Sequence, residues 1–293
     1  MATKKDSTLR RRYLGNELQR LREQAKKKLD DVADYMNCSP AKISRIEGGH
    51  VGATASDVRD MLEYYGVPRA EREKYVALTR RPPLPGWWRL YSDLIEKDEW
   101  FREYGPLEDR ASTLRVFENT LIPGLLQTAD YARALLSARR PTTSQTDIDR
   151  HVQFRIERQA ILRREKPPSY IAVFDEAALR RQVGTVDTMR AQLQYLIHCS
   201  ELAHVTIQVV PFSSGAYIGQ DGSFNILSFT EPHNPDVVYI ESTAGSLYLE
   251  KSEEVQYQID AFALIRKAAL SKQETSAFIR ILMSELREGE KNS

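Results

Sequence analysis

The segment from Leu29 to Gly49 constrains the fold of this chain more than any other. Its first part carries apolar residues at helical spacing over about two turns: Leu29, Val32, Ala33 and Met36. Asn37 follows, and asparagine tolerates the left-handed conformation that ends a helix. Ser39 and Pro40 are typical of the start of a second helix, and Gly48 is typical of its end. The pattern therefore predicts two short helices joined by a tight turn, a helix-turn-helix.

The second of these helices has an unusual surface. Ile43 and Ile46 are its large apolar residues and define one buried edge. A helix that enters the major groove of DNA needs an outward face without large apolar side chains and with hydrogen-bond donors. We therefore predict contacts to DNA bases from Ala41, Lys42, Ser44 and Arg45. For Lys42 and Arg45, contacts to phosphates are the alternative. The predicted phosphate contacts are Lys28, Ser39, Gly49 and His50.

Three further helices are predicted around this pair. A first apolar stripe repeats at helical spacing in Leu14, Leu18, Leu21 and Ala25. Thr54 and Asp57 form a capping-box pattern at the start of a helix that runs to Gly66. The stretch 71–80 suggests one more helix. Residues 1–81 thus read as an all-α, five-helix domain.

The proline cluster Pro82-Pro83-Leu84-Pro85 divides the chain into parts of opposite charge. Residues 1–81 contain 18 Lys and Arg against 12 Asp and Glu, a net charge of +6, and the rest of the chain has a net charge of −5. Such asymmetry indicates nucleic-acid binding by the basic part, and a solvated basic surface is the alternative. We predict a DNA-binding domain at 1–81, a linker with prolines and tryptophans at 82–105, and a second domain at 106–293.

The second domain mixes two patterns. Helical periodicity predicts helices over 106–119, 128–138, 147–165, 185–200, 252–269 and 272–286. Runs of β-branched and aromatic residues predict strands over 170–174, 205–210, 224–229, 237–240 and 247–249. Together they predict one larger α+β domain with a small sheet.

The run from Leu29 to Gly49 resembles the helix-turn-helix of the XRE family, the Cro/lambda-repressor-type regulators. In that resemblance, Arg22 and Glu47 match positions that form a structural ion pair. The run Leu121–Leu136 is similar to the opening of a domain of unknown function that follows this motif in many actinomycete regulators. Such regulators are often encoded beside a small partner protein. The chain departs from the pattern at 26–28, where three lysines replace Gly-Leu-Ser/Thr and remove an apolar anchor and a capping hydroxyl.

Patterns for catalysis and metal binding are weak. Gly215–Gly222 has the glycine density of a phosphate loop but lacks its lysine, so we expect a hairpin loop there. His198, Cys199 and His204 do not have the spacing of a zinc site. Asp175 and Glu176 follow a predicted strand and are typical of a helix cap. We therefore expect no enzyme, no metal and no cofactor.

The sequence predicts a sequence-specific transcriptional regulator that binds double-stranded DNA. Because one small domain contacts few base pairs, we expect a homodimer that reads an inverted repeat through the second helix of the motif. The alternative function is a protein-interaction module whose acidic C-terminal domain binds a small partner protein, with DNA binding secondary or masked. Two cysteines and no apolar run of membrane length favour a cytoplasmic, nucleoid-associated protein without membrane contact.

Overall fold

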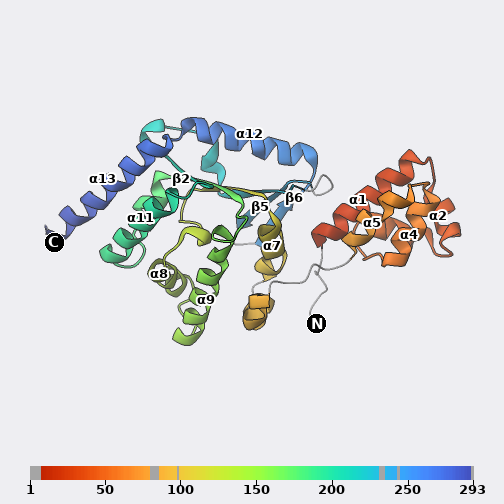
Figure 1. The fold of residues 1–293 in the computed structure, drawn as a ribbon, viewed down its shortest axis with the longest axis horizontal. Helices are drawn as coiled ribbons and strands as arrows, with labels where there is room; N and C mark the ends of the chain where they lie inside the picture. Colours follow the sequence, from red (N-terminus) through yellow and green to blue (C-terminus); the bar gives the residue numbers. More distant parts are fainter. Residues whose placement is uncertain (1–7, 80–85, 98, 231–234, 243–244, 292–293) are drawn as a thin grey trace. The chain divides into compact units, whose positions relative to one another are not determined.

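The computed structural model describes residues 8–79, 86–97, 99–230, 235–242 and 245–291 (Figure 1). The chain divides into two compact units: residues 1–90 with 101–106, and residues 91–100 with 107–293. Each unit is described here by itself. The proline cluster at 82–85, where the sequence placed the end of the first domain, lies outside the described residues.

The N-terminal unit is helical, as predicted. Over residues 8–79 it contains α1 (Thr8–Gln24), α2 (Leu29–Tyr35), α3 (Pro40–Glu47), α4 (Ala55–Tyr64) and α5 (Arg69–Leu78). All five contribute to one core, whose buried residues include Leu18, Val32, Ile43, Met61 and Val76. Ser39 caps α3 by accepting a hydrogen bond from the backbone N–H of Lys42, and Thr54 caps α4 through that of Asp57.

The segment that the sequence assigned to a linker is helical from Gly86 onward. It forms η1 (Gly86–Tyr91) and α6 (Ser92–Lys97), and α7 spans Glu99–Arg110. Trp88 is buried, and its ring packs against that of Phe101 with centroids 5.1 Å apart. Aromatic packing of this kind buries a large apolar area and stabilises the helical segment that follows Gly86.

The second unit contains a six-stranded sheet in the order β3-β2-β1-β4-β5-β6. The strands are β1 (Thr113–Glu118), β2 (Ser169–Asp175), β3 (Val205–Val210), β4 (Phe224–Ser228), β5 (Val237–Ser242) and β6 (Gly245–Leu249). β1, β2 and β3 are parallel, and β4, β5 and β6 continue the sheet with antiparallel pairings. The predicted α+β class is confirmed, and the sheet is larger than the small one expected.

Two expectations about this sheet were wrong. The helix expected over 106–119 ends at Arg110, and residues 113–118 form β1, which pairs with β2 on one side and β4 on the other. Hydrogen bonding to two neighbours and burial of Leu114, Val116 and Phe117 outweigh the local helical pattern. Gly215–Gly222 is not a hairpin loop, because β3 and β4 are not neighbours in the sheet and the connection contains η4 (Phe212–Ser214) and η5 (Ile218–Asp221).

Helices cover both faces of the sheet. Figure 1 shows α12 (Ser252–Ala268) on one side, where Phe262 and Ile265 join a core with sheet residues such as Val173. The other side carries α8 (Ala129–Arg139), α9 (Gln145–Arg158) and α11 (Val186–Ser200). The remaining elements are η2 (Gly124–Leu126), η3 (Gln159–Leu162), α10 (Glu176–Arg180) and α13 (Lys272–Lys291), and α13 packs on α11 and β3.

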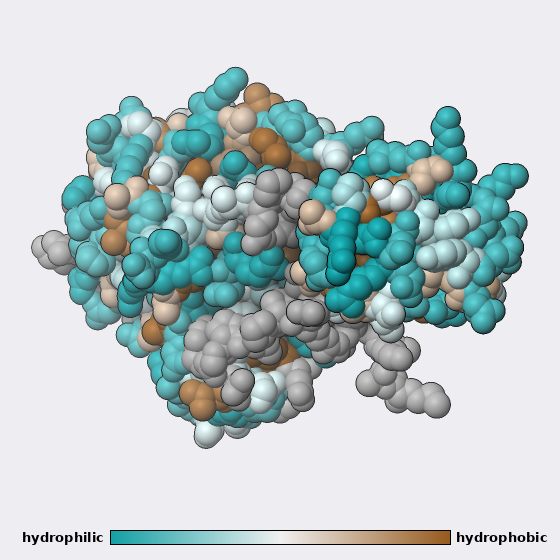
Figure 2. All heavy atoms as spheres, turned by 45° about the vertical axis from the view of Figure 1, so that its right-hand side comes forward, coloured by the Kyte–Doolittle hydropathy of each residue, from teal (hydrophilic) through white to brown (hydrophobic). Residues whose placement is uncertain are grey.

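The visible surface is mainly hydrophilic, with hydrophobic residues in small separate patches (Figure 2). Among the described helices, none combines the length and the apolar character that crossing a membrane requires.

Candidate nucleic-acid interface

The outward face of α3 carries the residues predicted to read DNA. Ala41, Lys42, Ser44 and Arg45 are all exposed. Ile43 and Ile46 anchor the opposite face in the core, at 0% and 2% exposure. The helix therefore presents a polar, partly cationic surface about two turns long, without a large apolar side chain, as the major groove requires.

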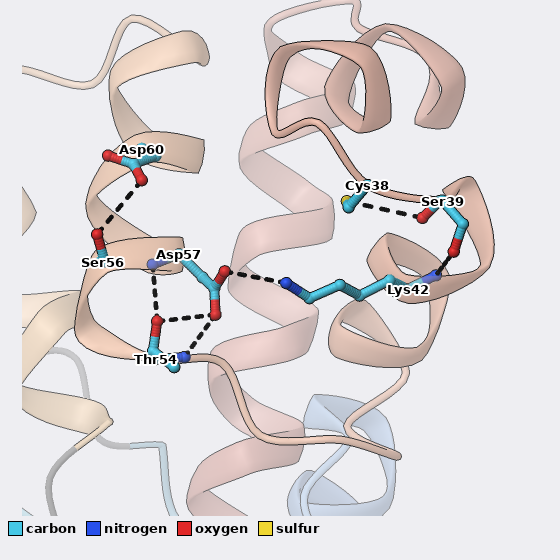
Figure 3. A network of polar contacts seen from close by, with 7 residues as sticks. All are labelled: Cys38, Ser39, Lys42, Thr54, Ser56, Asp57 and Asp60. Carbon is cyan, nitrogen blue, oxygen red and sulfur yellow. Dashed lines mark hydrogen bonds and ion pairs between the residues drawn. The ribbon is translucent and has the colours of Figure 1, made fainter.

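Lys42 and Arg45 differ in their contacts. The Lys42 ammonium lies 3.2 Å from Oδ1 of Asp57, at the start of α4 (Figure 3). Burial acts to raise the pKa of Asp57, but hydrogen bonds from Thr54 and Lys42 outweigh it and leave this pKa below its usual value. Asp57 is therefore ionised and holds Lys42 toward α4. Arg45 forms no ion pair with any residue that the structure describes, so its guanidinium is the freer of the two cations.

The predicted phosphate contacts lie around the ends of α2 and α3. Lys28, Ser39 and His50 are exposed. Gly49 is buried, its N–H donates to the Ile46 carbonyl at 3.0 Å, and its carbonyl accepts a 2.6 Å hydrogen bond from Nε of Arg11. A phosphate contact through the Gly49 N–H would therefore require an existing hydrogen bond to break. Arg11, which fastens this loop, was missed by the sequence reasoning, and the run Arg10-Arg11-Arg12 was its only signal.

The three lysines before α2 differ in their conformations and contacts. Lys26 adopts a left-handed conformation with φ of 55°, as glycine does more readily. The Lys27 ammonium lies 4.5 Å from the centre of the Tyr64 ring. The backbone N–H of Lys28 donates to the Asp31 carboxylate at 2.9 Å. α2 therefore begins at Leu29 without a capping hydroxyl.

Replacing Lys26 by Gly should stabilise the N-terminal unit by about 1 kcal/mol, because glycine adopts the left-handed conformation without the steric cost of a Cβ atom. Amide hydrogen exchange in α1 and α2 of the full chain measures this change. Lys28→Gly is the matched control: Lys28 has φ of −84°, so glycine there should bring no gain. Equal effects of the two substitutions would contradict the explanation.

A buried ion pair fixes α3 against α1. Nε and Nη2 of Arg22 donate to the two Glu47 carboxylate oxygens at 2.8 and 2.9 Å, and Nη1 donates to the Lys27 carbonyl at 3.0 Å. Glu47 is 4% exposed. The hydrogen bonds that Arg22 donates to Glu47 are the largest cause of the raised pKa of Arg22. The pair joins α1, the turn before α2 and the end of α3, and so sets the direction in which α3 projects.

His204, Cys199 and Asp175 were weighed for metal binding or catalysis, and the structure shows the surroundings of each. Over the described parts of the chain, no three His, Cys, Asp or Glu side chains are placed to hold a metal ion. His204 contacts the Leu162 carbonyl at 2.8 Å, and burial raises the pKa of the Cys199 thiol. Asp175 caps α10 through the backbone N–H of Ala177, as its position predicted.

A helical unit with this turn, this capped second helix and this polar outer face defines a helix-turn-helix domain, followed here by a separate α+β domain. Comparison with protein families agrees: a helix-turn-helix domain matches residues 13–74. A domain of unknown function, DUF5753, matches residues 101–281, more than half of the chain, and the chain belongs to this family. No curated protein and no solved structure matches the chain.

Proposed function

We propose that the protein is a sequence-specific DNA-binding transcriptional regulator of the XRE type, and not an enzyme. The observation that carries the proposal is the exposed, polar face of α3 within a unit that matches a helix-turn-helix domain. α3 enters the major groove, and the N–H groups at the helix starts add favourable contacts to phosphates. Such a regulator acts in the cytoplasm on the nucleoid.

Contacts divide into those that read sequence and those that position the domain. Arg45 and Ser44 face base edges, Ala41 meets a thymine methyl group, and Lys28, Ser39 and His50 face phosphates. Lys42 exchanges its contact with Asp57 for an acceptor on the DNA. Because the Lys42 ammonium has three donors and is 46% exposed, this exchange needs only a rotation of its side chain.

Two substitutions separate reading from positioning. Arg45→Ala should weaken binding to the specific site by about 1–3 kcal/mol and relax the base preference. Lys28→Ala should weaken binding evenly across sequences and reduce the salt slope by about 1. Fluorescence anisotropy on specific and random duplexes at several salt concentrations measures both effects. Equal losses on the two duplexes for Arg45→Ala would show that Arg45 contacts phosphates.

The regulator acts as a homodimer. One eight-residue helix spans few base pairs, so two copies of α3 about one helical turn of DNA apart are needed to specify a site. Selection of bound sequences from random DNA by the purified protein should recover an inverted repeat. Light scattering that shows a monomer both with and without the selected DNA would reject the homodimer.

A second candidate function is binding of a small partner protein by the C-terminal unit. Tyr257 and Leu264 of α12 favour it, since they are 61% and 51% exposed, seven residues apart on one helix. If partner binding is primary, purification from the native host should yield a stoichiometric second chain. Removing that chain should then change the affinity for DNA.

A further inference from the structure

Asp57 places a negative charge beside the helix that is proposed to read DNA. It is the third residue of α4, and its Oδ1 accepts a hydrogen bond from the Lys42 ammonium of α3 at 3.2 Å (Figure 3). DNA carries a negative charge on every phosphate, so a carboxylate close to the interface opposes binding to any sequence. The charge of Asp57 therefore lowers the affinity of the N-terminal unit for DNA in general.

The capping of α4 accounts for one oxygen of this carboxylate. Oδ2 of Asp57 accepts hydrogen bonds from the backbone N–H and the hydroxyl of Thr54, at 2.9 and 2.8 Å. Such a capping box needs only an acceptor at this position, because glutamine is used there as well as glutamate. Capping therefore requires neither the negative charge of Asp57 nor its second oxygen.

The second oxygen and the charge act on Lys42, which lies 15 residues earlier and on another helix. The two partners differ in mobility. The Asp57 side chain is 17% exposed and is fixed by Thr54, whereas the Lys42 side chain is 46% exposed and ends a flexible stem of four carbons. An exposed pair of this kind is weak, so Lys42 can leave it for a better acceptor while Asp57 stays in place.

Asp60, one turn further along α4, has no such link to α3. Its Oδ2 accepts a hydrogen bond from the Ser56 hydroxyl at 3.4 Å, and Figure 3 shows its side chain directed away from Lys42. Asp57 and Asp60 thus contribute the same charge to the same helix. Only the first of them contacts a residue that is predicted to touch DNA.

We propose that Asp57 is a positioning residue that increases the sequence specificity of DNA binding by holding Lys42 away from phosphates until a base acceptor replaces it. The proposal rests on the proposed function, in which α3 enters the major groove. At a matching site, an acceptor such as O6 or N7 of guanine takes over the Lys42 ammonium. At a non-matching site Lys42 stays on Asp57, and a contact to phosphate that any sequence would offer is not made.

Fluorescence anisotropy on the full chain tests this role. The measured quantity is the specificity ratio, which is the affinity for the duplex recovered by selection divided by that for a random duplex of equal length. Asp57→Asn keeps an acceptor for Thr54 and removes the charge. It should lower the specificity ratio by about threefold, mainly through tighter binding to the random duplex. The salt slope on the random duplex should steepen by about 1, since Lys42 then contacts a phosphate.

Three further variants separate positioning from capping and from net charge. Asp57→Glu keeps the charge and the capping pattern and should restore the specificity ratio to nearly the wild-type value. Asp57→Gln differs from that variant only in charge, should repeat the effect of Asp57→Asn, and decides the test if Asp57→Asn does not fold. Asp60→Asn is the matched control: it removes the same charge from α4 and should leave the specificity ratio and the salt slope unchanged.

A Lys42→Met background shows whether Asp57 acts through Lys42. In that background Asp57→Asn should leave the specificity ratio unchanged, because no ammonium remains to be positioned. A ratio that falls as far there as in the wild-type background would overturn the proposal, and so would a wild-type ratio in Asp57→Asn or Asp57→Gln. A wild type that binds both duplexes equally would contradict the proposed function and this proposal with it, whereas the other two results contradict the role of Asp57 alone.

Discussion

Replacing Glu47 by Gln is expected to lower the free energy of unfolding of the N-terminal unit by about 3–5 kcal/mol. The substitution leaves the Arg22 guanidinium buried without its counter-ion, and breaking a buried pair on one side costs this much. It also removes the contact that fixes the end of α3 to α1. Amide hydrogen exchange of Ile43 and Ile46 in the full chain measures the loss, because both residues are buried in the affected helix.

Two variants separate the burial of charge from the loss of a contact. Glu17→Gln removes the carboxylate of an exposed pair with Arg20 in the same unit, and such pairs contribute at most about 1 kcal/mol. The double variant Arg22→Met with Glu47→Leu replaces both charges by apolar groups and should recover most of the lost stability. A double variant as unstable as Glu47→Gln would show that the charge itself is not the cause.

The N-terminal unit could be predicted from its sequence because its local signals agree with one another. Ser39 and Pro40 mark the start of α3, Asn37 adopts the left-handed conformation with φ of 47°, and Thr54 caps α4. Each of these signals acts within a few residues along the chain. The tertiary fold adds to them without opposing them, so the five helices follow from the pattern.

The strand β1 could not be predicted in the same way. Residues 113–118 follow a helix directly, and their six-residue pattern is too short to distinguish a strand from a helical turn. What makes them a strand is pairing with residues 169–174 on one side and 224–228 on the other, which lie more than 50 residues away in sequence. The pattern of a single segment carries no information about such distant partners.

The candidate sites show the same limit. The outward face of α3 follows from spacing alone, and all four of its predicted readers are exposed. The contact between Lys42 and Asp57 and the hydrogen-bonded state of the Gly49 N–H depend on elements that meet only in three dimensions. Arg155 and Arg158 of α9 look alike in sequence, but Arg158 pairs with the buried Glu108, whereas Arg155 donates to Gln127.

Gly15 of α1 is the position where the addition of a single methyl group is expected to lower the stability of the N-terminal unit most. A Cβ atom there would lie 2.3 Å from the carbonyl oxygen of Glu47 and 2.6 Å from that of Ile46. Both obstacles are backbone atoms at the end of α3, so no side-chain rotation relieves the clash. α1 and α3 can approach this closely only because residue 15 has no side chain.

Gly15→Ala should therefore lower the free energy of unfolding of the N-terminal unit by about 3 kcal/mol through overpacking. The sign of this change in stability is informative, since alanine in the middle of an exposed helix would raise stability by about 1 kcal/mol over glycine.

Gly52→Ala is the matched control: the nearest atom to its added Cβ is 3.8 Å away, on the Arg11 side chain, and little change is expected. Chemical denaturation of the full chain, with hydrogen exchange to assign the loss to α1 and α3, measures both. A Gly15→Ala variant as stable as the wild type would mean that α1 and α3 lie further apart than described, and the direction of the outward face of α3 would have to change with them.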